Sequence, residues 1–162
     1  MDRAEMVKCE LATESLRSSG KLRFEAMGWS MMPTLWPRDI VEINRADGKN
    51  VAIGDIVLFV RTGKLCAHRV VSKSRGADGD IRFTTQGDSL PMADLEISSR
   101  ELLGKVCLIS RGKQSFQPSS KLSFCNRAMR SILRRSTFTS RVLARLHTMR
   151  QHPKECTAEC RC

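Results

Sequence analysis

Two side chains in the first half of this sequence, Ser30 and His68, are of types that can together break an acyl bond. A serine hydroxyl is a poor nucleophile at neutral pH until an adjacent base takes its proton. An imidazole titrates close enough to neutrality to accept that proton and return it. The two other histidines of the chain, His147 and His152, lie in a basic C-terminal tail. If the chain has a Ser-His pair, His68 is therefore its base.

The position of each residue along the chain leaves two interpretations open. Ser30 follows a stretch of alternating apolar and polar residues and precedes Pro33, which predicts a turn outside the paired backbone of a sheet. It is either an ordinary polar turn residue or a hydroxyl that faces a groove. His68 lies in an apolar run typical of a strand, and is either a packed histidine or a general base.

A set of motifs around these residues resembles the signal peptidase I family. The string Ser-Met-Met-Pro-Thr-Leu at residues 30–35, with Asp-Ile-Val at 39–41, is similar to the family's nucleophile box. Four further stretches resemble other boxes in the family's order: a Gly-Asp-hydrophobic strand at 54–59, a base box at 68–71, an acidic box with Gly87, Asp88 and Asp94, and a closing strand at 103–106. The resemblance covers roughly residues 22–110.

This resemblance implies a serine peptidase with Ser30 as nucleophile and His68 as general base. Bacterial-type members have lysine at the base position, whereas the endoplasmic-reticulum and archaeal type has histidine there and aspartates downstream, and this sequence follows the second pattern. Asp88 and Asp94 are both candidates for the carboxylate that fixes the tautomer of the histidine and stabilises its imidazolium. Taken singly, Asp88 would be a turn former and Asp94 a solvated loop carboxylate.

The mechanism and the family suggest how a substrate would be held. The developing oxyanion needs donors, of which the backbone N–H of Ser30 is the simplest. Met31 and Met32 are expected to line a shallow apolar substrate groove, or else to fill the core. Because the family's substrates bind extended beside a sheet edge, small residues are expected next to the scissile bond. Lys64 and Lys73 lie in polar contexts typical of exposed side chains, which does not favour a lysine base.

Short β-type runs separated by turn signals must position these residues. They predict a mainly β domain, coiled into a barrel or folded sheet of the signal peptidase type. The runs are residues 21–26, 40–43, 55–60, 65–71, 81–85 and 103–109. Apolar residues at loosely helical spacing predict a short helix over residues 5–18.

The domain boundaries follow changes of pattern in a chain of 162 residues. We expect a helical or irregular lead-in at 1–20, a β-rich catalytic domain at 21–111, a polar linker at 112–120, basic amphipathic helices at 121–150 and a Cys-rich tail at 151–162.

Positive charge gathers at the end of the chain. Residues 1–110 hold 16 basic and 15 acidic side chains, whereas the whole chain has a net charge of +11. The basic helices are expected either to contact anionic membrane, nucleic acid or an acidic partner, or to pack with their arginines in water.

Cysteine usage and hydropathy suggest a location. The seven cysteines are an odd number and lack the regular spacing of a disulfide framework. The sequence has no apolar run of about 18 residues, so it does not predict a transmembrane anchor of the kind that signal peptidases carry. We expect a cytoplasmic protein that at most touches the inner face of a membrane. No cofactor or metal is expected, since His152, Cys156, Cys160 and Cys162 do not have the spacing of a zinc site.

The sequence thus predicts a serine endopeptidase of the signal peptidase type, which hydrolyses a peptide bond in an extended peptide or precursor through an acyl-enzyme on Ser30. Two alternatives stay open. One is a catalytically silent binding protein with the same fold. The other is a self-processing regulator, since self-cleaving repressors share that fold. Either would use the basic tail on nucleic acid, a membrane or a partner.

Overall fold

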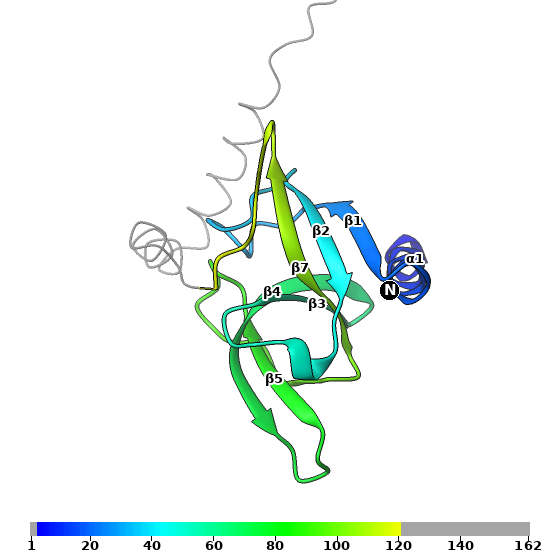
Figure 1. Cartoon of the computed structure of the whole chain (residues 1–162), viewed down its shortest axis with the longest axis vertical. Helices are drawn as coiled ribbons and strands as arrows, with labels where there is room; N and C mark the ends of the chain where they lie inside the picture. Colours follow the sequence, from blue (N-terminus) through cyan, green and yellow to red (C-terminus); the bar gives the residue numbers. More distant parts are fainter. Residues whose placement is uncertain (1–2, 121–162) are drawn as a thin grey trace, which may run out of the picture.

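The computed structural model describes residues 3–120, so the predicted basic helices at 121–150 and the tail at 151–162 lie outside the described residues. The described part is mainly β, as predicted, and its strand pairs are antiparallel (Figure 1). Its elements are α1 (Arg3–Ser18), β1 (Lys21–Glu25), β2 (Ile40–Arg45), the 3-10 turn η1 (Gly48–Asn50), β3 (Ile56–Arg61), β4 (Lys64–Arg75), β5 (Ile81–Gln86), β6 (Ile97–Ser98), β7 (Leu102–Arg111) and β8 (Gln114–Phe116).

The strands form one sheet in the order β1-β2-β7-β3-β4-β5-β6, with β8 added on β7. β7 pairs with β2 along one edge, and its other edge is shared by β3 near its start and β8 at its end. β8 lies inside the stretch 112–120, which the sequence predicts as a linker, so that prediction needs correction. The three residues of β8 are exposed, and an edge strand held by backbone hydrogen bonds needs no apolar pattern.

β3 is covered on both faces, which explains its continuous apolar sequence. Residues 56–59 are fully buried and alternate between two core clusters. Ile56 belongs to the first cluster and pairs with Arg69 on β4, whereas Val57 belongs to the second and pairs with His68. Since directly paired residues share a face of the sheet, His68 and Arg69 lie on opposite faces.

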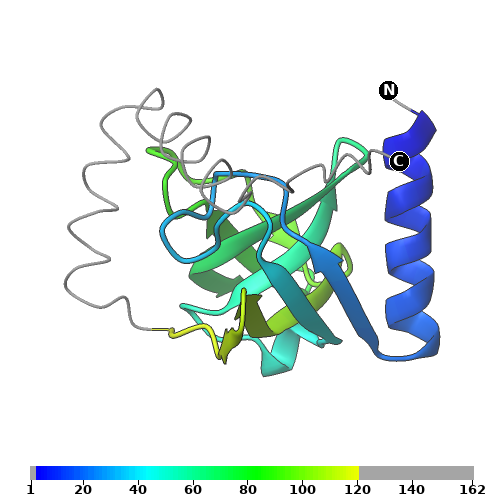
Figure 2. The ribbon, with the colours of Figure 1, turned by 90° about the horizontal axis from the view of Figure 1, so that it is seen from above.

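α1 stands beside β1 at the rim of the sheet (Figure 2). Cys9, Ala12 and Leu16 recur at helical spacing and are its buried residues. Leu16 joins the first core cluster, and the Cys9 thiol donates to the carbonyl oxygen of Gly63 in the β3–β4 turn, at 3.3 Å. Within residues 3–120, α1 included, no helix has both the length and the apolar character that crossing a bilayer requires.

Candidate active site

Ser30, His68 and Asp94 lie in a row, although they come from three separate segments. Ser30 is in the loop between β1 and β2, His68 is on β4, and Asp94 is in the loop between β5 and β6. The Nε2 atom of His68 lies 3.1 Å from Ser30 Oγ, and its Nδ1 atom lies 2.6 Å from Asp94 Oδ2. Both distances are within hydrogen-bond range, so the imidazole bridges the hydroxyl and the carboxylate.

The surroundings of Asp94 keep it ionised. Burial alone would raise the pKa of this carboxyl, but hydrogen bonds from His68 and Thr85, the charge that His68 carries when protonated and the charge of Arg61 outweigh burial, and the pKa is lowered. The Thr85 hydroxyl donates to Asp94 Oδ2 at 2.7 Å, and Nη1 of Arg61 lies 3.8 Å from Oδ1. An ionised carboxylate can only accept hydrogen bonds, so Nδ1 of His68 carries the proton that it donates to Asp94. Nε2 can then accept a hydrogen bond from the Ser30 hydroxyl.

The His68 ring is also held by packing. Its side chain is 11% exposed. The Phe59 ring meets it edge-on, with centroids 6.1 Å apart and planes at 69°. Phe59 lies on the adjacent strand β3 and on the same face as Val57, the partner of His68. The sheet therefore fixes both the position and the tilt of the imidazole.

The turn that begins at Ser30 is compact. The Met32 N–H donates to the Trp29 carbonyl at 3.1 Å, and the Leu35 N–H donates to the Met31 carbonyl at 2.9 Å. Met31 is 3% exposed within the first core cluster, and Met32 is fully buried against Trp29 and a second tryptophan, Trp36. The expectation that the two methionines line a substrate groove is therefore corrected: the turn directs both into the core.

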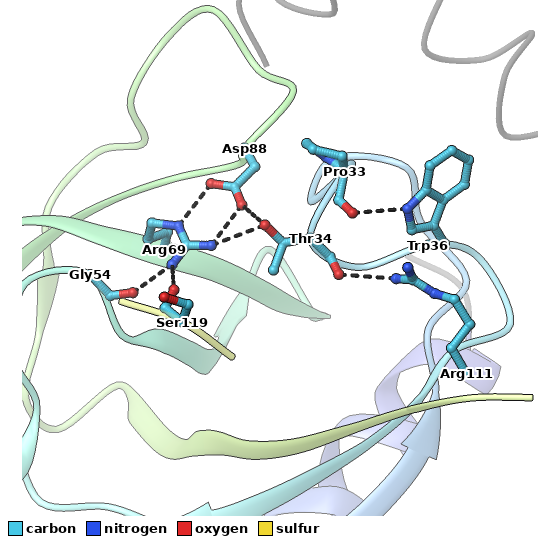
Figure 3. Close-up of polar contacts among 8 residues, drawn as sticks. All are labelled: Pro33, Thr34, Trp36, Gly54, Arg69, Asp88, Arg111 and Ser119. Atoms are coloured by element: carbon cyan, nitrogen blue, oxygen red, sulfur yellow. Dashed lines mark hydrogen bonds and ion pairs between the residues drawn. The ribbon is translucent and has the colours of Figure 1, made fainter. Parts of the chain in front are cut away.

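Asp88 contacts Arg69 instead of His68. Its carboxylate accepts from Nε and Nη2 of Arg69 at 2.9 and 2.8 Å, and from the Thr34 hydroxyl at 2.5 Å (Figure 3). Nη1 of Arg69 donates to the carbonyl oxygens of Gly54 and Ser119. The Asp88 side chain is 0% exposed and that of Arg69 4%. Asp88 therefore anchors the loop of Ser30 through Thr34, on the face of β4 opposite to His68.

A second arginine closes the other end of the same loop. Nε and Nη2 of Arg111 donate to the two oxygens of the buried Asp39 at 2.9 and 2.6 Å. Nη2 also donates to the Thr34 carbonyl at 3.1 Å, the contact that Figure 3 shows. The Asp39 carboxylate accepts a hydrogen bond from the backbone N–H of Trp36. The indole N–H of Trp36 donates to the Pro33 carbonyl. The loop that carries Ser30 is thus tied to β4 and β7.

Sequence reasoning missed Arg69, Arg111 and Thr85 as parts of this site. A signal existed for Arg69, because a charged residue inside an apolar strand run is buried only when it is paired. Arg111 and Thr85 carried no such signal, since a polar residue at a strand end is ordinary on the surface.

No family model matches the chain, and a search of curated proteins finds no match either. The geometry of Ser30, His68 and Asp94 and the order of the sequence boxes are therefore the observations that bear on function.

Proposed function

We propose that this protein is a serine endopeptidase of the signal peptidase type, with Ser30 as nucleophile, His68 as general base and Asp94 as the carboxylate that orients the base. The observation that carries the proposal is the hydrogen-bonded row from Ser30 Oγ through both ring nitrogens of His68 to Asp94. The sequence boxes had named Ser30 and His68, with Asp94 as one of two candidate carboxylates, and the three residues lie far apart along the chain.

The chemistry follows from the donors and acceptors in the row. Ser30 Oγ attacks the carbonyl carbon of an extended peptide while its proton passes to Nε2 of His68. The imidazolium, stabilised by Asp94, then gives that proton to the leaving amine, and the C–N bond breaks to leave an ester on Ser30. A water molecule gives its proton to Nε2, attacks the ester and releases the acid, and the proton returns to Ser30 Oγ.

The proposal extends to architecture and location. The antiparallel, mainly β sheet is compatible with the folded-sheet domain of signal peptidases. The substrate class is an extended peptide or precursor with small residues beside the scissile bond, as the resemblance implies. A cytoplasmic location, with the basic residues of 121–150 in contact with an anionic surface, completes the proposal and is supported by composition.

A fluorophosphonate probe, which reacts with activated serines, tests the assignment of the nucleophile. We expect the wild type and Ser110→Ala to be labelled equally, because the Ser110 hydroxyl bonds to Ser115 at the β7–β8 hairpin and is not part of the row. Ser30→Ala and His68→Ala should lose labelling. Equal labelling of Ser30→Ala would end the proposal.

A peptide library, read by mass spectrometry, tests the reaction itself. Cleavage that depends on Ser30 and favours small residues beside the cut supports the peptidase. Absence of cleavage, with binding of the full chain to RNA or anionic vesicles that falls steeply with salt, would favour the binding protein instead. If the purified chain cuts itself when it is incubated without any other protein, the self-processing regulator is favoured.

A further inference from the structure

Ser89 makes two hydrogen bonds to the turn of the nucleophile. Its hydroxyl donates to the Trp29 carbonyl at 3.0 Å, and its backbone N–H donates to the Ser30 carbonyl at 2.9 Å. Ser89 is fully buried. One residue, with no atom in the Ser30–His68–Asp94 row, thus holds the carbonyl groups on both sides of the Ser30 α-carbon.

These two contacts fix the direction of two backbone donors. In a trans peptide unit, the C=O and the following N–H are coplanar and point in opposite directions. The Trp29 carbonyl shares its unit with the Ser30 N–H, and the Ser30 carbonyl shares its unit with the Met31 N–H. Among residues 3–120 the cis peptide bond is Met32–Pro33, so both of these units are trans. The N–H groups of Ser30 and Met31 therefore point away from Ser89.

The two donors are also left without internal partners. Among the described residues, neither the Ser30 N–H nor the Met31 N–H donates a hydrogen bond. A buried N–H without a protein partner is uncommon in folded proteins, and Met31 is buried. A pair of N–H groups without protein partners, beside an activated hydroxyl, matches what a developing oxyanion requires. The Ser30 N–H belongs to the same residue as the attacking oxygen, so it is within reach of the carbonyl that this oxygen attacks.

The segment that carries Ser89 is itself held rigidly. Asp88 forms the buried pair with Arg69 described above. Gly87 approaches so closely that a Cβ atom placed there would lie 2.7 Å from the Ser30 carbonyl oxygen. The two residues before Ser89 therefore hold it against the turn of Ser30.

We infer that Ser89 is a positioning residue: it orients the backbone N–H of Ser30 toward the oxyanion of the substrate by holding the Trp29 carbonyl from the opposite side. This inference rests on the proposed peptidase function. The substrate contact is made by the backbone of Ser30, and Ser89 acts through it.

Three variants test the role with a peptide found in the library. Ser89→Ala removes the hydroxyl and Ser89→Thr retains one. Ser98→Ala is the matched control, since it removes a hydroxyl bond to Asp80 at the far end of β5. For Ser89→Ala we expect kcat to fall about tenfold to a hundredfold, somewhat less than removal of an oxyanion donor itself, while KM stays within about twofold. Ser89→Thr should recover most of the activity, and Ser98→Ala should behave as the wild type.

A peptide boronate provides a readout that simple loss of folding would not give. Its tetrahedral adduct places an oxygen where the oxyanion forms, so its inhibition constant for Ser89→Ala should rise by the same factor by which kcat/KM falls. If circular dichroism shows Ser89→Ala unfolded at the assay temperature, Ser89→Cys replaces it, because cysteine preserves the volume of the side chain and is a weaker donor. Ser89→Cys is then expected to show the same fall in kcat with little change in KM.

The outcomes separate this inference from the proposed function. A labelled, active wild type together with Ser89→Ala or Ser89→Cys at wild-type kcat would overturn the role of Ser89 and leave the peptidase standing. So would a defect confined to KM, or one equalled by Ser98→Ala. A wild type that neither hydrolyses peptides nor reacts at Ser30 would overturn the peptidase and this inference with it.

Discussion

His68 and Arg69 are neighbours on β4 but bond to different carboxylates, Asp94 and Asp88, on opposite faces of the sheet. The alternation of side chains along a strand makes this division unavoidable. One face holds the row that ends at Ser30, and the other holds the buried pair that anchors the loop of Ser30. The two aspartates of one acidic box therefore have different proposed roles, Asp94 in chemistry and Asp88 in structure.

Asparagine substitutions should separate these roles. Asp94→Asn removes the charge that stabilises the imidazolium and allows the wrong tautomer, so kcat should fall by about 10³- to 10⁴-fold, with a smaller loss of stability than in Asp88→Asn. Asp88→Asn leaves a buried guanidinium without its counter-charge and should lower the free energy of unfolding by about 3–5 kcal/mol. Kinetics and urea unfolding measure the two effects. Asp78→Asn, at an exposed ion pair, serves as the control. The reverse ranking of the two variants would contradict the division.

Thr85→Val should change how stability depends on pH. The lowered pKa of Asp94 means that its ionised form stabilises the fold above the ordinary value of 3.8, and that this contribution is lost as pH falls through the folded-state pKa. Removing the Thr85 hydroxyl should raise that pKa and lower the free energy of unfolding at neutral pH by about 1–3 kcal/mol. Urea unfolding should be measured between pH 7 and pH 3. The difference in free energy of unfolding between Thr85→Val and the wild type should become smaller below about pH 4. A constant difference would show that the loss comes from packing alone.

Arg111→Leu should weaken the loop that carries Ser30. The substitution removes both bonds to Asp39, which is 0% exposed. Because Arg111 itself is 30% exposed, we expect a loss of about 2–3 kcal/mol, less than for a fully buried pair. Thermal unfolding measures it, and kcat should fall in the same variant. In the double variant with Asp39→Asn, the second substitution should cost less than it does alone; strict additivity would argue against a direct pair.

Gly87→Ala should displace the nucleophile. Its new Cβ would come within 2.7 Å of the Ser30 carbonyl oxygen, so Ser30 must move and kcat should fall at least about tenfold. Gly79→Ala is the control, since nothing lies within 4 Å of a Cβ there, although its φ of +78° makes alanine strained. We expect the control to lose stability and to keep its activity. Unchanged kinetics in Gly87→Ala would mean that the close approach has no effect on the reaction.

Much of the sheet could be predicted from local pattern. The apolar runs at 55–60 and 65–71 were predicted as β-type runs, and in the structure they pair as a hairpin whose turn residues, Thr62 and Gly63, have the positive φ typical of tight hairpins. β8 was missed because its three residues are exposed, so no buried apolar side chain marks it in the sequence.

The site was predictable only as far as residue type and motif order extend. Ser30 and His68 could be named before the structure, because one turn serine and one strand histidine fitted the boxes. The choice between Asp88 and Asp94 depends on the path of the loop after β5, which no local pattern contains. For Met31 the sequence left groove and core both open, because an apolar side chain beside a candidate nucleophile suits either, and the structure buries it in the core.

The carbonyl oxygen of Ser119 accepts Nη1 of Arg69 at 3.0 Å, and the carbonyl oxygen of Ser120 lies against Gly54 so closely that a Cβ there would come within 2.7 Å of it. The folded unit therefore extends past β8. A polypeptide shortened at Arg111, where the change of sequence pattern suggests a boundary, would lose one of the acceptors of a buried guanidinium. Any excised version meant for crystallisation or assay should include Ser120.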